Sequence, residues 1–237
     1  MNYYLLCNLD DLAKNILVDS RGKFNVRKMK PNRTLPFQVN VTSVSKRINE
    51  DFDVNQDINE TTSNLMKFVK EYKLHRSYSI QKLDTLKLYF KQYLKFLHKD
   101  SFVELSKCDR FSRDNFNGVS IKATRDINKD TILKYVIGIF KKIPKSEEHI
   151  VTNEKLNFSL LYTSRTNSTH VLLGPISFVN HDCHPNTEYH FRTSYSLQLK
   201  VIKNIKKGEE ILVKYSDDYF GPNNEDCECT SCLNKSR

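Results

Sequence analysis

The sequence lacks several features that define whole classes of protein. It contains no tryptophan, and hydrophobic residues make up 38% of its 237 residues, which is typical of a soluble globular protein with a lean core. No run of about 18 apolar residues occurs, so we expect no membrane-spanning helix. The segment that begins at Met1 has no basic stretch and soon reaches Asp10 and Asp11, so we expect no secretory signal peptide. We find no internal repeat.

Six cysteines without an export signal favour a reducing, intracellular compartment, where disulfides are rare. Four of them form a C…CxCxxC pattern, made by Cys183, Cys227, Cys229 and Cys232. One distant cysteine beside three closely spaced ones is typical of a closed tetrahedral zinc site, so we predict one structural zinc ion. The alternatives are four unrelated buried thiols or, less favoured, a disulfide pair. Metal binding would pull the C-terminal tail back onto residues 178–183.

Charge is distributed unevenly along the chain. The net charge is +10, and residues 1–107 hold 19 basic and 12 acidic side chains, against 19 and 16 in the remainder. The basic excess of the first half favours contact with a polyanion such as DNA. A lysine-rich solvated surface without a partner explains the charge equally well.

The first half of the chain reads as helical. Apolar spacing predicts a helix over residues 8–30, with Asp10 and Asp11 in its first turn, where the helix dipole favours acidic groups, and with Gly22 at its end. Residues 31–63 show little periodicity and are rich in polar residues, which predicts a long connection.

Two more amphipathic helices follow. The spacing of apolar residues predicts one helix over residues 64–76 and another up to Leu97, with Ser79 as its N-cap. The apolar stripe of the second helix recurs at i, i+3 and i+7, so it must be buried against another layer.

The pattern changes after Asp100 to short strands. Alternating or continuous apolar runs predict strands at residues 118–124, 131–140, 171–173, 197–201 and 211–215. The chain therefore reads as α+β, with a helical front and a β-rich back joined near residue 105.

Three motifs in one order give a resemblance to a known family. They are NHDCHPN at residues 180–186, GEE at 208–210 followed by Tyr215, and CxCxxC at 227–232. Together they resemble SET-domain protein-lysine methyltransferases. Residues 108–112, 158–165 and 215–225, with Asp10 to Ala13 at the front, resemble the branch that methylates lysine 20 of histone H4 (the Suppressor of variegation 4-20 type).

The resemblance implies an architecture of three parts. A helical N-terminal domain at 1–105 would pack on a SET domain at 106–221, with a post-SET zinc-binding segment at 222–237. The Asn180 segment would be threaded through a loop, a pseudo-knot that is rare among folds.

The resemblance also implies a function and a setting. The protein would be a nuclear, chromatin-bound histone-lysine N-methyltransferase that uses S-adenosylmethionine to add methyl groups, up to two or three, to lysine 20 of histone H4 on nucleosomes. The basic first half would suit nucleosomal DNA, and a basic histone tail would suit the acidic C-terminal third. The alternatives are a SET enzyme acting on another protein lysine, or a catalytically silent SET-like module that binds chromatin.

Site residues follow from the same matching. Tyr215 would be catalytic, orienting the lysine nitrogen and the methyl group. Ser159, beside the methyl acceptor, and Tyr162, Tyr189 and Phe220, along the lysine channel, would contact the substrate. Each of these residues could instead be an ordinary core side chain. Leu172 stands where the branch usually has a tryptophan.

The cofactor would lie against a second set of residues. The predicted contacts are Asp109, Arg110, Phe111, Ser112, Asn117, Gly118, Asn180, His181 and Glu228. A buried Asn180–His181 pair held by internal hydrogen bonds is compatible with this role. Gly118 starts a GVS sequence where the wider family has GxG, a loss that is typical of the branch.

Overall fold

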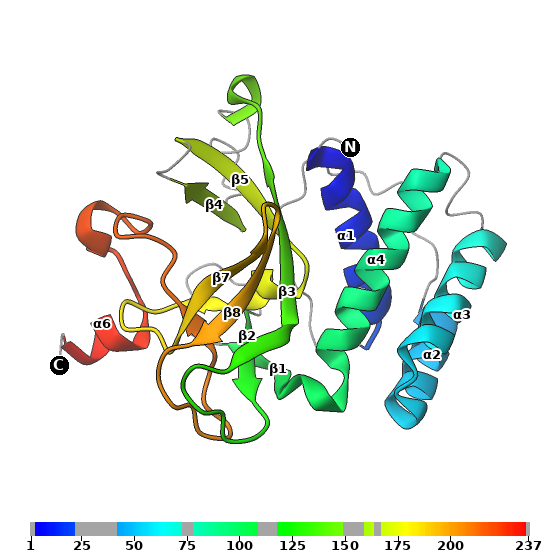
Figure 1. Cartoon of the computed structure of the whole chain (residues 1–237), viewed down its shortest axis with the longest axis horizontal. Helices are drawn as coiled ribbons and strands as arrows, with labels where there is room; N and C mark the ends of the chain where they lie inside the picture. The colour runs from blue at the N-terminus through cyan, green and yellow to red at the C-terminus, as the bar shows by residue number, and fades with distance from the viewer. Residues whose placement is uncertain are drawn as a thin grey trace.

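The computed structural model describes residues 3–21, 42–72, 78–108, 118–148, 159–163 and 167–235. Its helical layer and its β-sheets lie side by side, with the C-terminal tail on the far side of the sheets (Figure 1). The long helices are α1 (Tyr3–Leu17), α2 (Thr42–Asn55), α3 (Ile58–Glu71) and α4 (Ile80–Leu97), and the short helix α6 is Thr230–Lys235. None of the described helices combines the length and the apolar character needed to cross a membrane.

Nine short strands form three sheets in the described part of the chain. The strands are β1 (Val103–Cys108), β2 (Gly118–Ala123), β3 (Ile132–Lys142), β4 (Leu160–Thr163), β5 (Ser168–Leu173), β6 (Asn180–His181), β7 (Thr187–Thr193), β8 (Ser196–Val201) and β9 (Leu212–Val213). The largest sheet has the order β4-β5-β3-β8-β7, β1 pairs with β2, and β6 runs parallel to β9. Short 3-10 helices include η1 (Asp19–Arg21), η5 (Pro175–Phe178) and η6 (Pro222–Asn224). The predicted α+β class is confirmed.

Helix α4 joins the two layers. Ser79 caps it as predicted, because its side chain accepts a hydrogen bond from the Lys82 backbone N–H. The predicted apolar stripe is buried, and Tyr93 and Phe96 both pack against Phe178, with ring centroids 6.1 and 6.0 Å apart. One continuous core therefore runs from the helices to η5, directly before the NH motif.

The prediction for the first helix is wrong in its start and its end. Helix α1 begins at Tyr3 and ends at Leu17, so Asp10 lies in the helix interior instead of the first turn. Its side chain is only 1% exposed, and its Oδ1 accepts hydrogen bonds from the Tyr93 hydroxyl at 2.8 Å and the Gly174 N–H at 3.0 Å. This carboxylate therefore connects α1 to α4 and to the N-cap of η5. Gly22 and the rest of the predicted helix lie outside the described residues.

The long connection predicted over 31–63 is also wrong within its described part, since α2 and the first turns of α3 occupy it. The buried face of α2 carries Ser45 and Asn49 beside Phe52, so its hydrophobic periodicity is weak. Asn49 Nδ2 donates to the Ile16 carbonyl at 3.1 Å, which replaces part of the missing apolar contact. Asp57 caps α3.

Candidate active site and metal centre

A small cleft lies where β4, β5, η5, β7 and the chain after β9 converge. Its walls include Ser159, Leu172, Val179, Tyr189, Tyr215 and Tyr219. The structure thus brings together the predicted catalytic tyrosine and two of the predicted substrate residues, which come from distant parts of the chain. Leu172, at the departure from the branch pattern, forms part of the same wall.

Aromatic rings surround one end of this cleft. The ring centroids of Tyr215 and Tyr219 are 4.9 Å apart, and Phe220 lies 4.8 Å from Tyr219 and stacks on Tyr215 at 6.4 Å. Burial raises the pKa of Tyr219, so its phenol stays neutral at physiological pH. Such a cluster suits the aliphatic stem of a lysine that enters end-on. Sequence reasoning missed Tyr219, although it lies between two residues that it had singled out.

Tyr215 is fixed at both ends. Its hydroxyl donates to the Val179 carbonyl at 2.7 Å, and its backbone N–H donates to His181 Nδ1 at 3.1 Å. Residues 179–181 thus hold the side chain and the main chain of Tyr215 in place.

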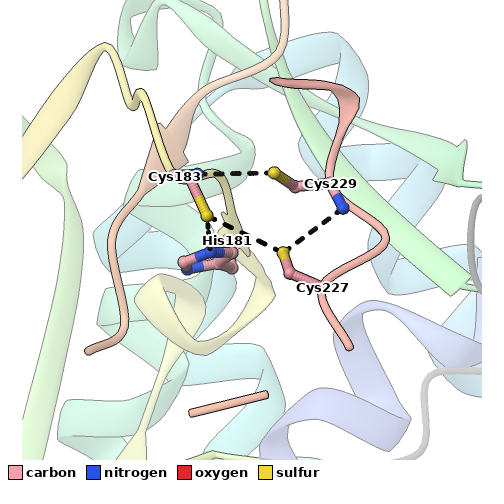
Figure 2. Close-up of side chains that lie close together, drawn as sticks. All are labelled: His181, Cys183, Cys227 and Cys229. Atoms are coloured by element: carbon pink, nitrogen blue, oxygen red, sulfur yellow. Dashed lines mark hydrogen bonds between the residues drawn. The ribbon is translucent and has the colours of Figure 1, made fainter. Parts of the chain in front are cut away.

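The four cysteines of the predicted zinc site come together at the other side of His181 (Figure 2 shows three of them). Cys183 Sγ lies 3.9 Å from Cys227 Sγ and 3.5 Å from Cys232 Sγ. Four sulfurs at about 2.3 Å from a tetrahedral zinc ion would be about 3.8 Å apart. The Cys183 N–H donates to Cys229 Sγ at 3.5 Å. The two Sγ–Sγ distances from Cys183 are therefore close to those of a tetrahedral thiolate site.

His181 is a further potential ligand, since its ring lies with Cys183, Cys227 and Cys229 in a group whose ligand atoms are all within 4.8 Å of one another. The hydrogen bonds decide against this role. A backbone N–H can only donate, so Nδ1 must accept from Tyr215, and the neutral ring then carries its proton on Nε2. That nitrogen lies 3.3 Å from Cys183 Sγ and donates to it. This arrangement leaves Nε2 without a lone pair for a metal, so Cys232 stays the predicted fourth ligand.

The thiols of this group differ in the direction in which their pKa values are shifted. Burial raises the pKa of Cys183 to about 11 and also raises the pKa of Cys227. Both are thiols at neutral pH when no metal is bound, and a metal ion would displace their protons. Burial also acts to raise the pKa of Cys229, but backbone N–H groups of Cys183 and Cys232 outweigh it and lower that pKa.

Comparison with known proteins adds the family. The SET domain family matches residues 118–216, a range that holds the cleft and the NH motif. The chain contains a SET domain. The cysteines of the tail, Cys227, Cys229 and Cys232, lie beyond the matched residues.

Curated relatives of this SET domain carry related names. The chain is 26% identical to histone-lysine N-methyltransferase Suv4-20 of Caenorhabditis briggsae over 235 residues, covering 98% of this chain and 71% of the relative. The Suv4-20 protein of Caenorhabditis elegans is also 26% identical, over 96% of this chain and 78% of the relative. Histone-lysine N-methyltransferase set9 of Neurospora crassa is 35% identical over 64% of this chain, which covers 19% of that relative. The chain thus spans about a fifth of the length of this fungal relative.

The predicted cofactor residues of the SET domain are placed only in part. Asp109, Arg110, Phe111, Ser112 and Asn117 lie outside the described residues. Gly118 pairs with Cys108, and a Cβ at this position would lie 2.7 Å from the Cys108 carbonyl oxygen, so the pairing of β1 with β2 itself calls for glycine. Glu228 lies between two of the cysteines. These assignments stay predictions, as do the three domain boundaries and the pseudo-knot.

Asn180 shows what its side chain can offer a ligand. Its Nδ2 donates to the Val119 carbonyl and to Glu210 Oε1, both at 2.9 Å. Both N–H donors of the amide are therefore used within the SET domain, and the amide oxygen is the group left to accept from a bound molecule.

The predicted substrate residues differ in their surroundings. Ser159 holds a φ of 85°, an uncommon conformation outside glycine, and its carbonyl accepts from the Leu172 N–H at 2.7 Å. Phe220 belongs to the aromatic cluster, 5.1 Å from His181. Tyr162 is 57% exposed, and its hydroxyl donates to Asn167 Oδ1 at 2.6 Å. Tyr162, a residue of β4 that pairs with Thr169 of β5, thus lies at the surface.

Proposed function

We propose that this chain is an S-adenosylmethionine-dependent protein-lysine methyltransferase that methylates lysine 20 of histone H4 on nucleosomes, adding up to two or three methyl groups. The observation that carries the proposal is the hydroxyl of Tyr215 in an aromatic cleft beside Ser159, inside a SET domain. The names of the relatives support a histone substrate.

The chain's own residues perform three tasks in this reaction. Tyr215, Tyr219 and Tyr189 hold the lysine stem and exclude water, which favours the neutral amine that the transfer requires. The Tyr215 hydroxyl, anchored on the Val179 carbonyl, orients the amine. Ser159 limits the space for added methyl groups. S-adenosylmethionine would supply the electrophilic methyl group.

The NH motif offers the cofactor a hydrogen-bond acceptor. The Asn180 amide oxygen is an acceptor for the ammonium group of S-adenosylmethionine. The backbone of His181 and Glu228, together with Gly118 and the predicted residues of 109–117, would hold the remainder.

We also assign one structural zinc ion to Cys183, Cys227, Cys229 and Cys232, supported by the sulfur spacing. The ion would fix the tail against the NH motif. Asp182 reinforces this contact, because its Oδ2 accepts from the Ser231 N–H at 3.3 Å and its Oδ1 accepts from the His184 N–H at 2.8 Å.

Charge supports a basic substrate on chromatin. Asp217, Asp218, Glu225 and Asp226 are exposed around the tail, where a lysine- and arginine-rich histone tail would be attracted. The basic excess of the first half suits nucleosomal DNA, which would place the enzyme in the nucleus.

Mass spectrometry of recombinant nucleosomes after incubation with protein and S-adenosylmethionine tests the proposal. Nucleosomes with unmodified and with premethylated H4 would be run in parallel. We expect added methyl groups on the H4 tail, and at least tenfold slower addition with the Tyr215→Phe variant. Methylation of another protein instead would reject the H4 assignment and retain a lysine methyltransferase. Cofactor binding without any transfer would favour a silent SET-like module.

A further inference from the structure

We propose that His181 is a positioning residue that couples the metal centre to Tyr215. Its imidazole bridges the metal-bound sulfur of Cys183 and the backbone N–H of Tyr215, so that filling the metal site fixes the lysine cleft. The inference rests on the proposed function, since it gives the cleft and the metal their roles.

The two ring nitrogens of His181 have opposite hydrogen-bonding roles. The Tyr215 N–H donates to Nδ1 at 3.1 Å, and Nε2–H donates to Cys183 Sγ at 3.3 Å. One imidazole thus joins the two centres with a single tautomer and no intervening group. A sulfur bound to a metal carries negative charge and accepts such a bond more strongly than a thiol does. Metal binding should therefore tighten the His181 end and, through the ring, the Tyr215 end.

The surroundings leave the ring little freedom. His181 is 2% exposed, and its centroid lies 5.4 Å from that of Tyr215 and 5.1 Å from that of Phe220. Its backbone belongs to β6, which pairs with β9 so that His181 faces Val213. Tyr215 follows Val213 by two residues, and its N–H donates to the His181 ring. A shift of the ring would therefore move the cleft tyrosine directly.

Tyr215 has its second anchor in the same segment. Its hydroxyl bonds the Val179 carbonyl, two residues before His181. Segment 179–183 therefore carries both supports of the tyrosine and one ligand of the metal. The coupling path is five residues long, so it requires no movement of a whole domain.

Two substitutions test the two hydrogen bonds of the ring one at a time. His181→Asn keeps an acceptor oxygen near the Nδ1 position but loses the donor to sulfur. His181→Gln keeps a donor near the Nε2 position but loses the acceptor for Tyr215. His170→Asn is the matched control, because His170 is also buried (8% exposed), and its Nδ1 contacts the Ser168 carbonyl instead of the cysteines.

The experiment uses the full chain loaded with cobalt(II) as a spectroscopic substitute for zinc. In His181→Asn we expect the sulfur-to-cobalt charge-transfer band to move to lower energy, and metal affinity to fall about 10- to 100-fold, as for other residues that orient metal ligands. In His181→Gln we expect a band close to that of the wild type, a displaced Tyr215 amide resonance, and a lower kcat with little change in the peptide KM. His170→Asn should keep the wild-type band.

The wild type gives a readout that does not depend on any variant folding. Long-range ¹H–¹⁵N spectra of zinc-loaded protein should show the His181 proton on Nε2, and the Tyr215 amide resonance should shift on metal removal. In His181→Asn that shift should be lost. The coupling would be overturned if His181→Asn kept the wild-type cobalt band and metal affinity. It would also be overturned if the Tyr215 amide resonance of the wild type did not shift on metal removal.

Failure of the proposed function would give results that differ from those of a failed coupling. A wild type that binds no cobalt rejects the metal centre and the coupling together. A wild type with the expected cobalt and amide responses but no methyl transfer supports the structural coupling and rejects the enzyme assignment.

Discussion

Segment 179–183 concentrates the chemistry of this protein at the scale of single residues. Val179 holds the Tyr215 hydroxyl, Asn180 ties β6 to β2, His181 holds the Tyr215 backbone, and Cys183 contacts the other cysteines. Each group has a defined partner, so single substitutions here should have separable effects.

Tyr215→Phe removes the hydroxyl and leaves the ring in the aromatic cluster. We expect the methyl-transfer rate to fall at least tenfold, because the group that orients the amine is lost, while S-adenosylmethionine affinity changes little. Transfer assays and calorimetry measure the two quantities. An unchanged rate would remove Tyr215 from its proposed role.

Asp10→Ala leaves two buried donors, the Tyr93 hydroxyl and the Gly174 N–H, without this acceptor. We expect the free energy of unfolding to fall by about 2–4 kcal/mol in urea titration. Asp10→Asn keeps one acceptor oxygen, so its loss should be smaller. Equal stability of both variants and the wild type would contradict the role of this carboxylate.

At the scale of elements, η5 lines the cleft and packs against β3. Gly138 of β3 lies so close to η5 that a Cβ would be 2.0 Å from Ile176 Cγ2 and 2.9 Å from the Leu173 carbonyl oxygen. Ile176 in turn lines the cleft. The packing of these two elements therefore affects both stability and the shape of the cleft.

Gly138→Ala should destabilise the fold by about 1–3 kcal/mol through overpacking and should lower turnover by displacing Ile176. Thermal melting and transfer assays check this. Ile176→Ala in the same chain should recover part of the lost stability. Gly208→Ala is the control, since nothing lies within 4 Å of its Cβ and only the cost of its φ of 86° applies, about 1–2 kcal/mol. A Gly138→Ala protein as stable as the wild type would show that η5 adjusts freely.

At the scale of the whole molecule, the chain folds back on itself at both ends. Helix α1 packs against α4 and β5, and the C-terminal cysteines return to the NH motif. The tail holds few apolar side chains, so the Asp182 hydrogen bonds and the proposed zinc ion would supply most of its docking.

Removal of zinc should therefore release the tail. We expect a chelator to lower the free energy of unfolding by about 3 kcal/mol or more and to weaken S-adenosylmethionine binding. Cys229→Ser should act in the same direction, and Cys7→Ser, a buried thiol on α1, should keep the metal stoichiometry. Metal analysis with thermal melting measures both. Full zinc and unchanged cofactor binding in Cys229→Ser would contradict this role of the tail.

The sequence by itself determined the α+β class, the cap of α4, the positions of most strands and the three motifs. Each of these features depends on the spacing of residues that are close together in the sequence, so the sequence alone can predict it. It could not predict α2, because Ser45 and Asn49 on the buried face of that helix hide its periodicity. Only the tertiary structure decided that Asp10 joins three elements, that Tyr219 lines the cleft, and that His181 donates to the sulfur of Cys183. These roles depend on partners 30 or more residues away, or on which ring nitrogen meets a backbone N–H, and neither is encoded in local spacing.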